Sequence, residues 1–168
     1  SPKPGDVGFS FSSPWIINSE IIEIFGGNIF NLHGQALPNY RGAGGYSWNI
    51  MQEDRKGGVS IHRLISELDG GEIFAQIHFD FPENICTPIE YAEYAEEQAV
   101  VLLSTWLRKL IETGNSGLSN SNESTQSTYW PRLNTDVHGW IDWSWNSEHL
   151  ISFVNAFSHP HAGARTTL

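Results

Sequence analysis

Residues 7–112 alternate strand patterns with helix patterns, and this alternation is the feature that most restricts the fold. Strand patterns cover residues 7–11, 28–32, 58–64 and 73–79, and helix patterns cover residues 21–25, 46–52 and 88–112. Alternating elements of this kind are typical of an α/β protein with an open sheet. We therefore expect an open α/β sheet in which the strand at 28–32 delivers His33 into a loop, at an edge where such sheets bind ligands.

The longest helix pattern runs from Pro88 to about residue 112. Glu90 stands three residues after Thr87, which is the spacing of a capping box. Apolar residues then recur at helical intervals, so one face of this helix is expected to be buried. The shorter helix at 21–25 has Ser19 as its candidate cap.

Composition divides the chain into three parts. Residues 1–113 carry the α/β pattern, residues 114–128 form a linker of Ser, Asn, Gly and Gln, and residues 129–168 form a Trp-rich segment. Four of the seven tryptophans lie in this last part, which also has a helix pattern at 147–157. Dense aromatic residues can stack on bases or pterins, but they are more typical of a compact packing module, which is the interpretation we favour.

The charge balance argues against a nucleic-acid partner. Nine Lys and Arg against nineteen Asp and Glu give a formal net charge of −10, which repels phosphate backbones and favours a small-molecule substrate. The sequence has no apolar run of about 18 residues, so we expect no membrane span. Cys86 is the single cysteine, which excludes an internal disulfide and favours a cytoplasmic location. His159 and His161 lack a third ligand at suitable spacing, so we expect no metal.

Asn31, His33 and Asp69 are the candidate catalytic residues. A carboxylate can orient and charge an imidazole, the imidazole can move a proton, and an amide can donate a hydrogen bond to a developing oxyanion. Acyl transfer to an amine needs all three groups. Each residue by itself is also typical of a turn or a cap, so the hypothesis depends on their combination.

Four motifs then point to one family. They are Asn31-x-His33, Leu37-Pro38-x-Tyr40-Arg41-Gly42, Gly58-Val59-Ser60-Ile61-His62 and Leu68-Asp69-Gly70-Gly71-Glu72-Ile73. Together they resemble the 10-formyltetrahydrofolate-dependent formyltransferases, which include methionyl-tRNA formyltransferase, glycinamide ribonucleotide formyltransferase and the sugar N-formyltransferases. The resemblance covers roughly residues 6 to 112. In addition, Trp130-Pro131-Arg132-Leu133, Ile141-Asp142-Trp143 and Gly163-Ala164 are similar to the segment that follows the family's catalytic domain.

The resemblance implies a fold and a mechanism. The fold would be the second half of the family's Rossmann-like, three-layer open sheet, followed by the start of its C-terminal segment. Asn31 would stabilise a tetrahedral intermediate, His33 would donate and accept protons, and Asp69 would raise the pKa of His33, because a carboxylate favours a nearby imidazolium. A primary amine, expected on an amino sugar or a nucleotide-linked amino sugar, would attack the formyl group carried at N10 of the folate.

The resemblance also implies a folate slot between two loops. Their positions match the family's folate-contacting residues, and apolar faces with free backbone groups suit a heterocycle that has many donors and acceptors. The implied contact residues are Trp15, Ile16, Ile17, Ile65, Ser66, Glu67, Leu68 and Asp69. 10-Formyltetrahydrofolate would be the formyl donor, with no metal.

Departures from the family pattern leave alternatives open. Gln35 and Ala36 replace the usual Ser and large apolar residue, and Ala43 replaces an Arg that contacts UDP-4-amino-4-deoxyarabinose in its formyltransferase, so that substrate is not supported. The family's catalytic domain has further strands before the one that begins at Val7, so we expect this chain to be part of a longer protein. Methionyl-tRNA formylation, hydrolysis of 10-formyltetrahydrofolate and folate binding without turnover remain alternatives, and a homo-oligomer is compatible with the sequence.

Overall fold

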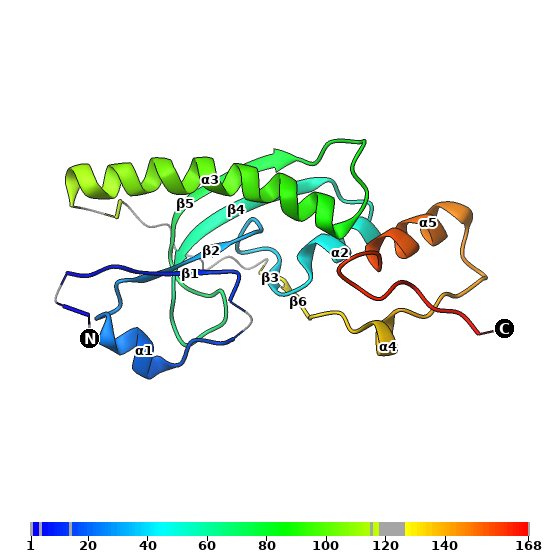
Figure 1. Cartoon of the computed structure of the whole chain (residues 1–168), viewed down its shortest axis with the longest axis horizontal. Helices are drawn as coiled ribbons and strands as arrows, with labels where there is room; N and C mark the ends of the chain where they lie inside the picture. The colour runs from blue at the N-terminus through cyan, green and yellow to red at the C-terminus, as the bar shows by residue number, and fades with distance from the viewer. Residues whose placement is uncertain (1, 4, 14, 115, 118–126, 168) are drawn as a thin grey trace.

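Four strands form one open sheet in the order β1-β2-β4-β5 (Figure 1). In this computed structural model the described residues are 2–3, 5–13, 15–114, 116–117 and 127–167. The strands are β1 (Gly8–Phe11), β2 (Ile29–His33), β4 (Lys56–Arg63) and β5 (Ile73–Asp80). β1 and β2 are parallel, whereas β2–β4 and β4–β5 are antiparallel. The expected open α/β sheet is confirmed.

The crossover between β1 and β2 contains α1 (Ser19–Ile24), and here two sequence predictions need correction. The side chain of Asn18 accepts a hydrogen bond from the Ile21 backbone nitrogen, so Asn18 is the cap and Ser19 is the first helical residue. β2 ends one residue later than expected, because its pairing with β4 continues to His33 opposite Ser60. His33 is therefore held by a strand rather than by a loop.

The long helix α3 (Pro88–Thr113) covers one face of the sheet (Figure 1). Its predicted capping box is present, and the Glu90 carboxylate accepts a hydrogen bond from the Thr87 backbone nitrogen. Trp106 of α3 contacts Phe30 of β2 edge to face, with ring centroids 5.0 Å apart. Because side chains alternate along a strand, this contact directs Asn31 and His33 to the opposite face.

The C-terminal part of the chain packs back onto the α/β unit. β6 (Tyr129–Trp130) pairs in parallel with β3 (Arg41–Gly42), and α5 (Ser147–Ala156) packs against α2 (Gly45–Met51). A short helix, α4 (Thr135–His138), lies between β6 and α5. The predicted linker at 114–128 lies largely outside the described residues.

One continuous core joins these parts. Its members are Phe30, Ile50, Val59, Ile61, Phe81, Tyr91, Ala95, Ala99, Leu102, Trp106, Leu133, Phe153, Ala156 and Phe157. The Trp-rich segment contributes Leu133, Phe153, Ala156 and Phe157, so it shares one apolar core with the sheet and α3. No helix in the described parts of the chain is long and apolar enough to cross a membrane.

Candidate active site

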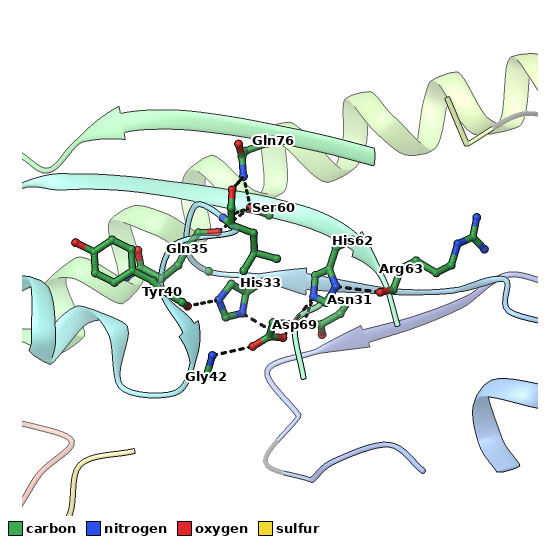
Figure 2. A network of polar contacts seen from close by, with 12 residues as sticks. Asn31, His33, Gln35, Tyr40, Gly42, Ser60, His62, Arg63, Asp69 and Gln76 are labelled. Atoms are coloured by element: carbon green, nitrogen blue, oxygen red, sulfur yellow. Dashed lines mark hydrogen bonds and ion pairs between the residues drawn. The ribbon is translucent and has the colours of Figure 1, made fainter. Parts of the chain in front are cut away.

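Strands β2 and β4 place three polar side chains on the face of the sheet opposite α3. The antiparallel register sets His62 opposite Asn31, and Ser60 opposite His33. His62 is only 1% exposed. Because residues two apart on a strand share a face, Asn31 and His33 lie side by side. Figure 2 shows them together with His62 and Asp69.

A backbone carbonyl fixes the proton of His33. Its Nε2 lies 2.9 Å from the Tyr40 carbonyl oxygen. A carbonyl oxygen only accepts hydrogen bonds, so Nε2 carries a proton and donates a hydrogen bond to the Tyr40 carbonyl. The neutral imidazole then has its lone pair on Nδ1, which lies 3.8 Å from Asp69 Oδ1. The nitrogen that can take up a proton is therefore Nδ1, on the side that faces Asp69.

Asp69 lies in the loop between β4 and β5 and is 7% exposed. Its φ of 49° is left-handed, a conformation that Asp tolerates better than most residues. Oδ2 accepts a hydrogen bond from the Gly42 backbone nitrogen at 2.9 Å, while Oδ1 lies 3.5 Å from His62 Nε2. Burial alone would raise the pKa of Asp69, but the contact with His62, the charge of His33 and the Gly42 bond together lower it. Asp69 is thus an anion held between two imidazoles.

The pKa of His33 lies below its ordinary value of 6.5. Burial disfavours the charged imidazolium and is the largest influence, whereas Asp69 and the Tyr40 carbonyl act in the opposite direction. Asp69 does raise the pKa of His33, as expected, but burial outweighs it and the net direction is downward. A neutral His33 is suited to begin as a base, and its imidazolium is then stabilised by Asp69.

His62 is the site residue that sequence reasoning did not assign a role. Its Nε2 lies 3.1 Å from the Asn31 Nδ2, and its Nδ1 lies 3.0 Å from the Arg63 carbonyl oxygen. The residue stands within the quoted Gly58–His62 motif, but its pairing with Asn31 depends on an antiparallel register between two strands. An alternation pattern alone does not specify that register.

The turn after His33 is anchored by buried polar groups. Ser60 Oγ accepts hydrogen bonds from the Leu37 backbone nitrogen and from Gln76 Nε2, and it donates one to the Gln35 carbonyl oxygen. Gln35, a departure from the family pattern, is buried and donates from Nε2 to Asn49 Oδ1 at 2.9 Å. The turn is therefore fixed from the strands beneath it.

The structure brings Asn31, His33 and Asp69 together, and it places the other predicted site residues on the surface. Trp15 and Ile16 are 80% and 81% exposed, in the segment that follows the carboxyl end of β1. Ile17 is half-buried. Four exposed residues precede Asp69 in its loop, namely Ile65, Ser66, Glu67 and Leu68. Glu67 forms an ion pair with Arg41 at 2.6 Å.

The arrangement offers a base, a neighbouring anion and an amide donor, and no metal chemistry is needed for it. Within the described ranges, no group of three His, Cys, Asp or Glu side chains could hold a metal ion. A proton can move through His33 Nδ1, and the Asn31 amide, on the same face of β2, has an N–H that can polarise a carbonyl oxygen. These are the groups that acyl transfer to an amine requires.

Comparison with a family described as formyl transferase gives a match over residues 13–101. This match covers more than half of the chain and includes all three candidate catalytic residues. The chain belongs to the formyl transferase family. The predicted family is thus confirmed.

Individual known proteins resemble most of the chain. The bifunctional polymyxin resistance protein ArnA of Wigglesworthia glossinidia brevipalpis is 27% identical over 96% of this chain, which corresponds to 24% of ArnA. The PseJ formyltransferase of Anoxybacillus kamchatkensis, in complex with UDP-4,6-dideoxy-4-formamido-L-AltNAc and tetrahydrofolate, is 28% identical, with a TM-score of 0.64 over 75% of this chain and 64% of PseJ.

A third protein is more similar to this chain in fold than in sequence. The N-formyltransferase of Helicobacter canadensis, in complex with folinic acid and dTDP-3-aminofucose, has a TM-score of 0.75 and 22% identity, over 89% of this chain and 54% of that enzyme. The chain therefore spans about a quarter of ArnA and about half of the Helicobacter enzyme.

Proposed function

We propose that this chain carries the formyl-transfer centre of an enzyme that moves a formyl group from 10-formyltetrahydrofolate to the primary amine of a nucleotide-linked amino sugar. The observation that carries the proposal is the position of His33, whose Nδ1 faces the buried Asp69 carboxylate and whose side chain shares a face of β2 with Asn31. The bound folates and nucleotide sugars of PseJ and the Helicobacter enzyme support the donor and the acceptor class.

In the proposed reaction, His33 carries one proton from the attacking amine to N10 of the folate. The neutral amine attacks the formyl carbon, and a C–N bond forms while an N–H of Asn31 donates to the developing oxyanion. His33 Nδ1 accepts a proton from the attacking nitrogen, and Asp69 stabilises the resulting imidazolium. The bond from the carbon to N10 then breaks, and His33 returns the proton to N10. The products are the formamide and tetrahydrofolate.

The folate is proposed to bind between residues 15–17 and 65–69. Trp15 and Ile16 present large apolar surfaces at the edge where β1 and β2 end, and such surfaces suit a flat heterocycle. We assign the reaction to the cytoplasm because Cys86 is a free, exposed thiol. The net charge of −10 disfavours the acceptor stem of a tRNA as substrate.

The test is release of tetrahydrofolate, followed by absorbance, from 10-formyltetrahydrofolate mixed with dTDP-linked or UDP-linked amino sugars. We expect release that depends on an amino sugar. His33→Gln should lower kcat by about two to three orders of magnitude, because it removes the proton carrier. His78→Gln, at an exposed histidine of β5, is the matched control and should be unchanged.

Other outcomes point to the alternatives. Equal release without any amine would indicate a hydrolase, and release that requires methionyl-tRNA would indicate a tRNA formyltransferase. Binding of folinic acid in calorimetry, with no turnover on any acceptor, would indicate folate binding without catalysis. A His33→Gln protein that reacts at the wild-type rate would exclude the assigned chemistry.

A further inference from the structure

His62 is a buried imidazole in the middle of the sheet, and both of its nitrogens have polar neighbours. A buried polar group is costly unless it is hydrogen-bonded, so these neighbours determine where its protons lie. Nδ1 lies 3.0 Å from the Arg63 carbonyl oxygen, and Nε2 lies 3.1 Å from Asn31 Nδ2. The contact between Asn31 and His62 is drawn in Figure 2.

The Arg63 carbonyl decides the tautomer of His62. It can only accept, so Nδ1 carries the proton of the neutral ring, and Nε2 is left with a lone pair. A lone pair on Nε2 accepts an N–H from Asn31 and repels the amide oxygen. The Asn31 amide is therefore held with its nitrogen toward His62. The amide nitrogen has two hydrogens, and the second remains available to the reaction centre.

Of the two side chains with a polar atom facing Nε2, Asn31 is nearer to it than Asp69 is. Asp69 Oδ1 lies 3.5 Å from Nε2, and the His33 ring lies with its centroid 6.2 Å away. The neighbouring Arg63 guanidinium is directed elsewhere, because it donates to the Gly27 carbonyl and lies 3.5 Å from Glu72. The two imidazoles have opposite tautomers, since His33 donates from Nε2 to Tyr40 and His62 donates from Nδ1 to Arg63.

We propose that His62 is a positioning residue that fixes the orientation of the Asn31 amide, so that Asn31 presents an N–H rather than a carbonyl oxygen to the reacting formyl group. The kinetic consequence rests on the proposed function, whereas the tautomer and the amide orientation do not. His62 acts through Asn31 and does not itself contact the substrate. Its loss should therefore affect the transition state more than the binding of either substrate.

Two substitutions separate this role from simple packing. The side-chain oxygen of His62→Gln can reach the place of Nε2 and accept from Asn31, whereas His62→Met has a similar length and no comparable acceptor. We expect His62→Gln to keep kcat within about threefold of wild type, and His62→Met to lower kcat at least about tenfold with KM for the folate unchanged. His78→Gln and His78→Met are matched controls at an exposed position of β5 and should leave kcat unchanged.

A double-mutant cycle tests whether His62 acts through Asn31. In an Asn31→Ala background, His62→Met should change kcat by less than about twofold. Losses that multiply independently, or a His62→Met protein with wild-type kcat, would overturn the proposal. Circular dichroism would establish that each variant is folded before its rate is compared.

A second measurement is independent of turnover. Nitrogen-15 NMR of labelled histidines in the whole chain should show that the neutral ring of His62 is protonated at Nδ1 and bare at Nε2. The side-chain amide resonances of Asn31 should shift more in His62→Met than in His62→Gln. A protonated Nε2 on His62 would overturn the inference even if formyl transfer is observed, and the predicted tautomer would support it even if the chain transfers no formyl group.

Discussion

The indole of Trp130 stacks on the phenol ring of Tyr40, with ring centroids 5.5 Å apart and 20° between the ring planes. The backbone carbonyl of Tyr40 accepts the hydrogen bond from His33 Nε2. Its own backbone nitrogen donates to Thr128 Oγ1, and its hydroxyl donates to Asp54. A residue of the C-terminal segment thus holds in place the group that fixes the tautomer of the candidate catalytic histidine.

Trp130→Ala should weaken both the fold and the site. The substitution removes the stack on Tyr40, so we expect the free energy of unfolding to fall by about 2 kcal/mol, less than for a fully buried tryptophan. The bond from His33 to the Tyr40 carbonyl should loosen, which lowers kcat more than it raises KM. Chemical denaturation and steady-state kinetics measure both effects. Trp140→Ala is the control, because Trp140 is 45% exposed and its indole donates to the Asp136 carbonyl instead of stacking on Tyr40. Equal losses in both variants would contradict the role of the stack.

Gly42→Ala should disturb Asp69. Gly42 has a φ of +99°, and a Cβ added there would lie 2.5 Å from the Trp130 carbonyl oxygen. The backbone would have to move, and its N–H would move away from Asp69. We expect a loss of about 2 kcal/mol or more in unfolding free energy, together with reduced kcat.

Gly26→Ala is the matched control for that change. Gly26 also has a positive φ, of +59°, but an added Cβ would meet nothing within 4 Å. It should lose only about 1 kcal/mol, from backbone strain, and its kcat should be unchanged. If the two alanine variants behaved alike, the contact with Trp130 would not be what requires glycine at position 42.

Asp69→Asn should lower the pKa of His33 further. The Asp69 charge acts upward on the pKa of His33 against the larger effect of burial, so neutralising it leaves burial less opposed. NMR titration of the His33 ring measures the change directly. Asp80→Asn, which removes an exposed carboxylate paired with Lys56, should leave the pKa of His33 unchanged. A rise in the His33 pKa in Asp69→Asn would contradict the arrangement.

Acid should destabilise the protein in two windows. The pKa of His33 is lowered in the folded state, so the unfolded chain binds more protons below pH 6.5, and stability falls as the pH falls from there through the folded pKa. The pKa of Asp69 is also lowered in the folded state, so stability falls again as the pH falls below the ordinary Asp pKa of 3.8.

Urea unfolding between pH 7 and pH 5 isolates the contribution of His33. In His33→Asn the loss of stability over this range should be smaller than in wild type. His161, whose pKa is likewise lowered by burial, contributes in the same direction, so some slope should remain. A slope unchanged by His33→Asn would show that His33 does not titrate differently in the folded and unfolded states.

Ser60→Ala should cost more than its size suggests. The Leu37 backbone nitrogen and Gln76 both donate to Ser60 Oγ inside the protein, and Ala would leave these buried donors without that acceptor. We expect a loss of about 2 kcal/mol in unfolding free energy. Ser104→Ala on the exposed side of α3 is the control and should have little effect. Thermal or urea unfolding of the two variants decides whether the turn after His33 depends on Ser60.

The elements that were predicted from sequence are those whose signals are local. The helix at 88–113 carries its own capping box and apolar period, and the sheet strands carry their own apolar runs. The pairing of β3 with β6 carries no such signal, because each strand has two residues and its partner is remote. Asn18 and Ser19 are both good capping residues, so sequence alone did not distinguish them.

The sequence predicted which residues form the candidate site, but only part of their arrangement. Asn31, His33 and Asp69 have the chemistry of an acyl-transfer site wherever they fold together. The net lowering of the His33 pKa depends on how completely the sheet and its loops exclude water, which no sequence pattern reports. The role of His62 depends on the register of β2 against β4, and a shift of one residue would direct it to the other face.

The pairing of β3 with β6 has a consequence for the order of folding. Tyr40 and Thr128, which are joined across it, lie 88 residues apart in the chain. During synthesis from the N-terminus, the loop beside His33 emerges long before the segment that anchors it, and closing so long a loop is entropically slow. A nascent chain can therefore assemble its sheet and long helix while the candidate site is still incomplete, and the Tyr40 backbone beside His33 gains its anchor only when the Trp-rich segment docks.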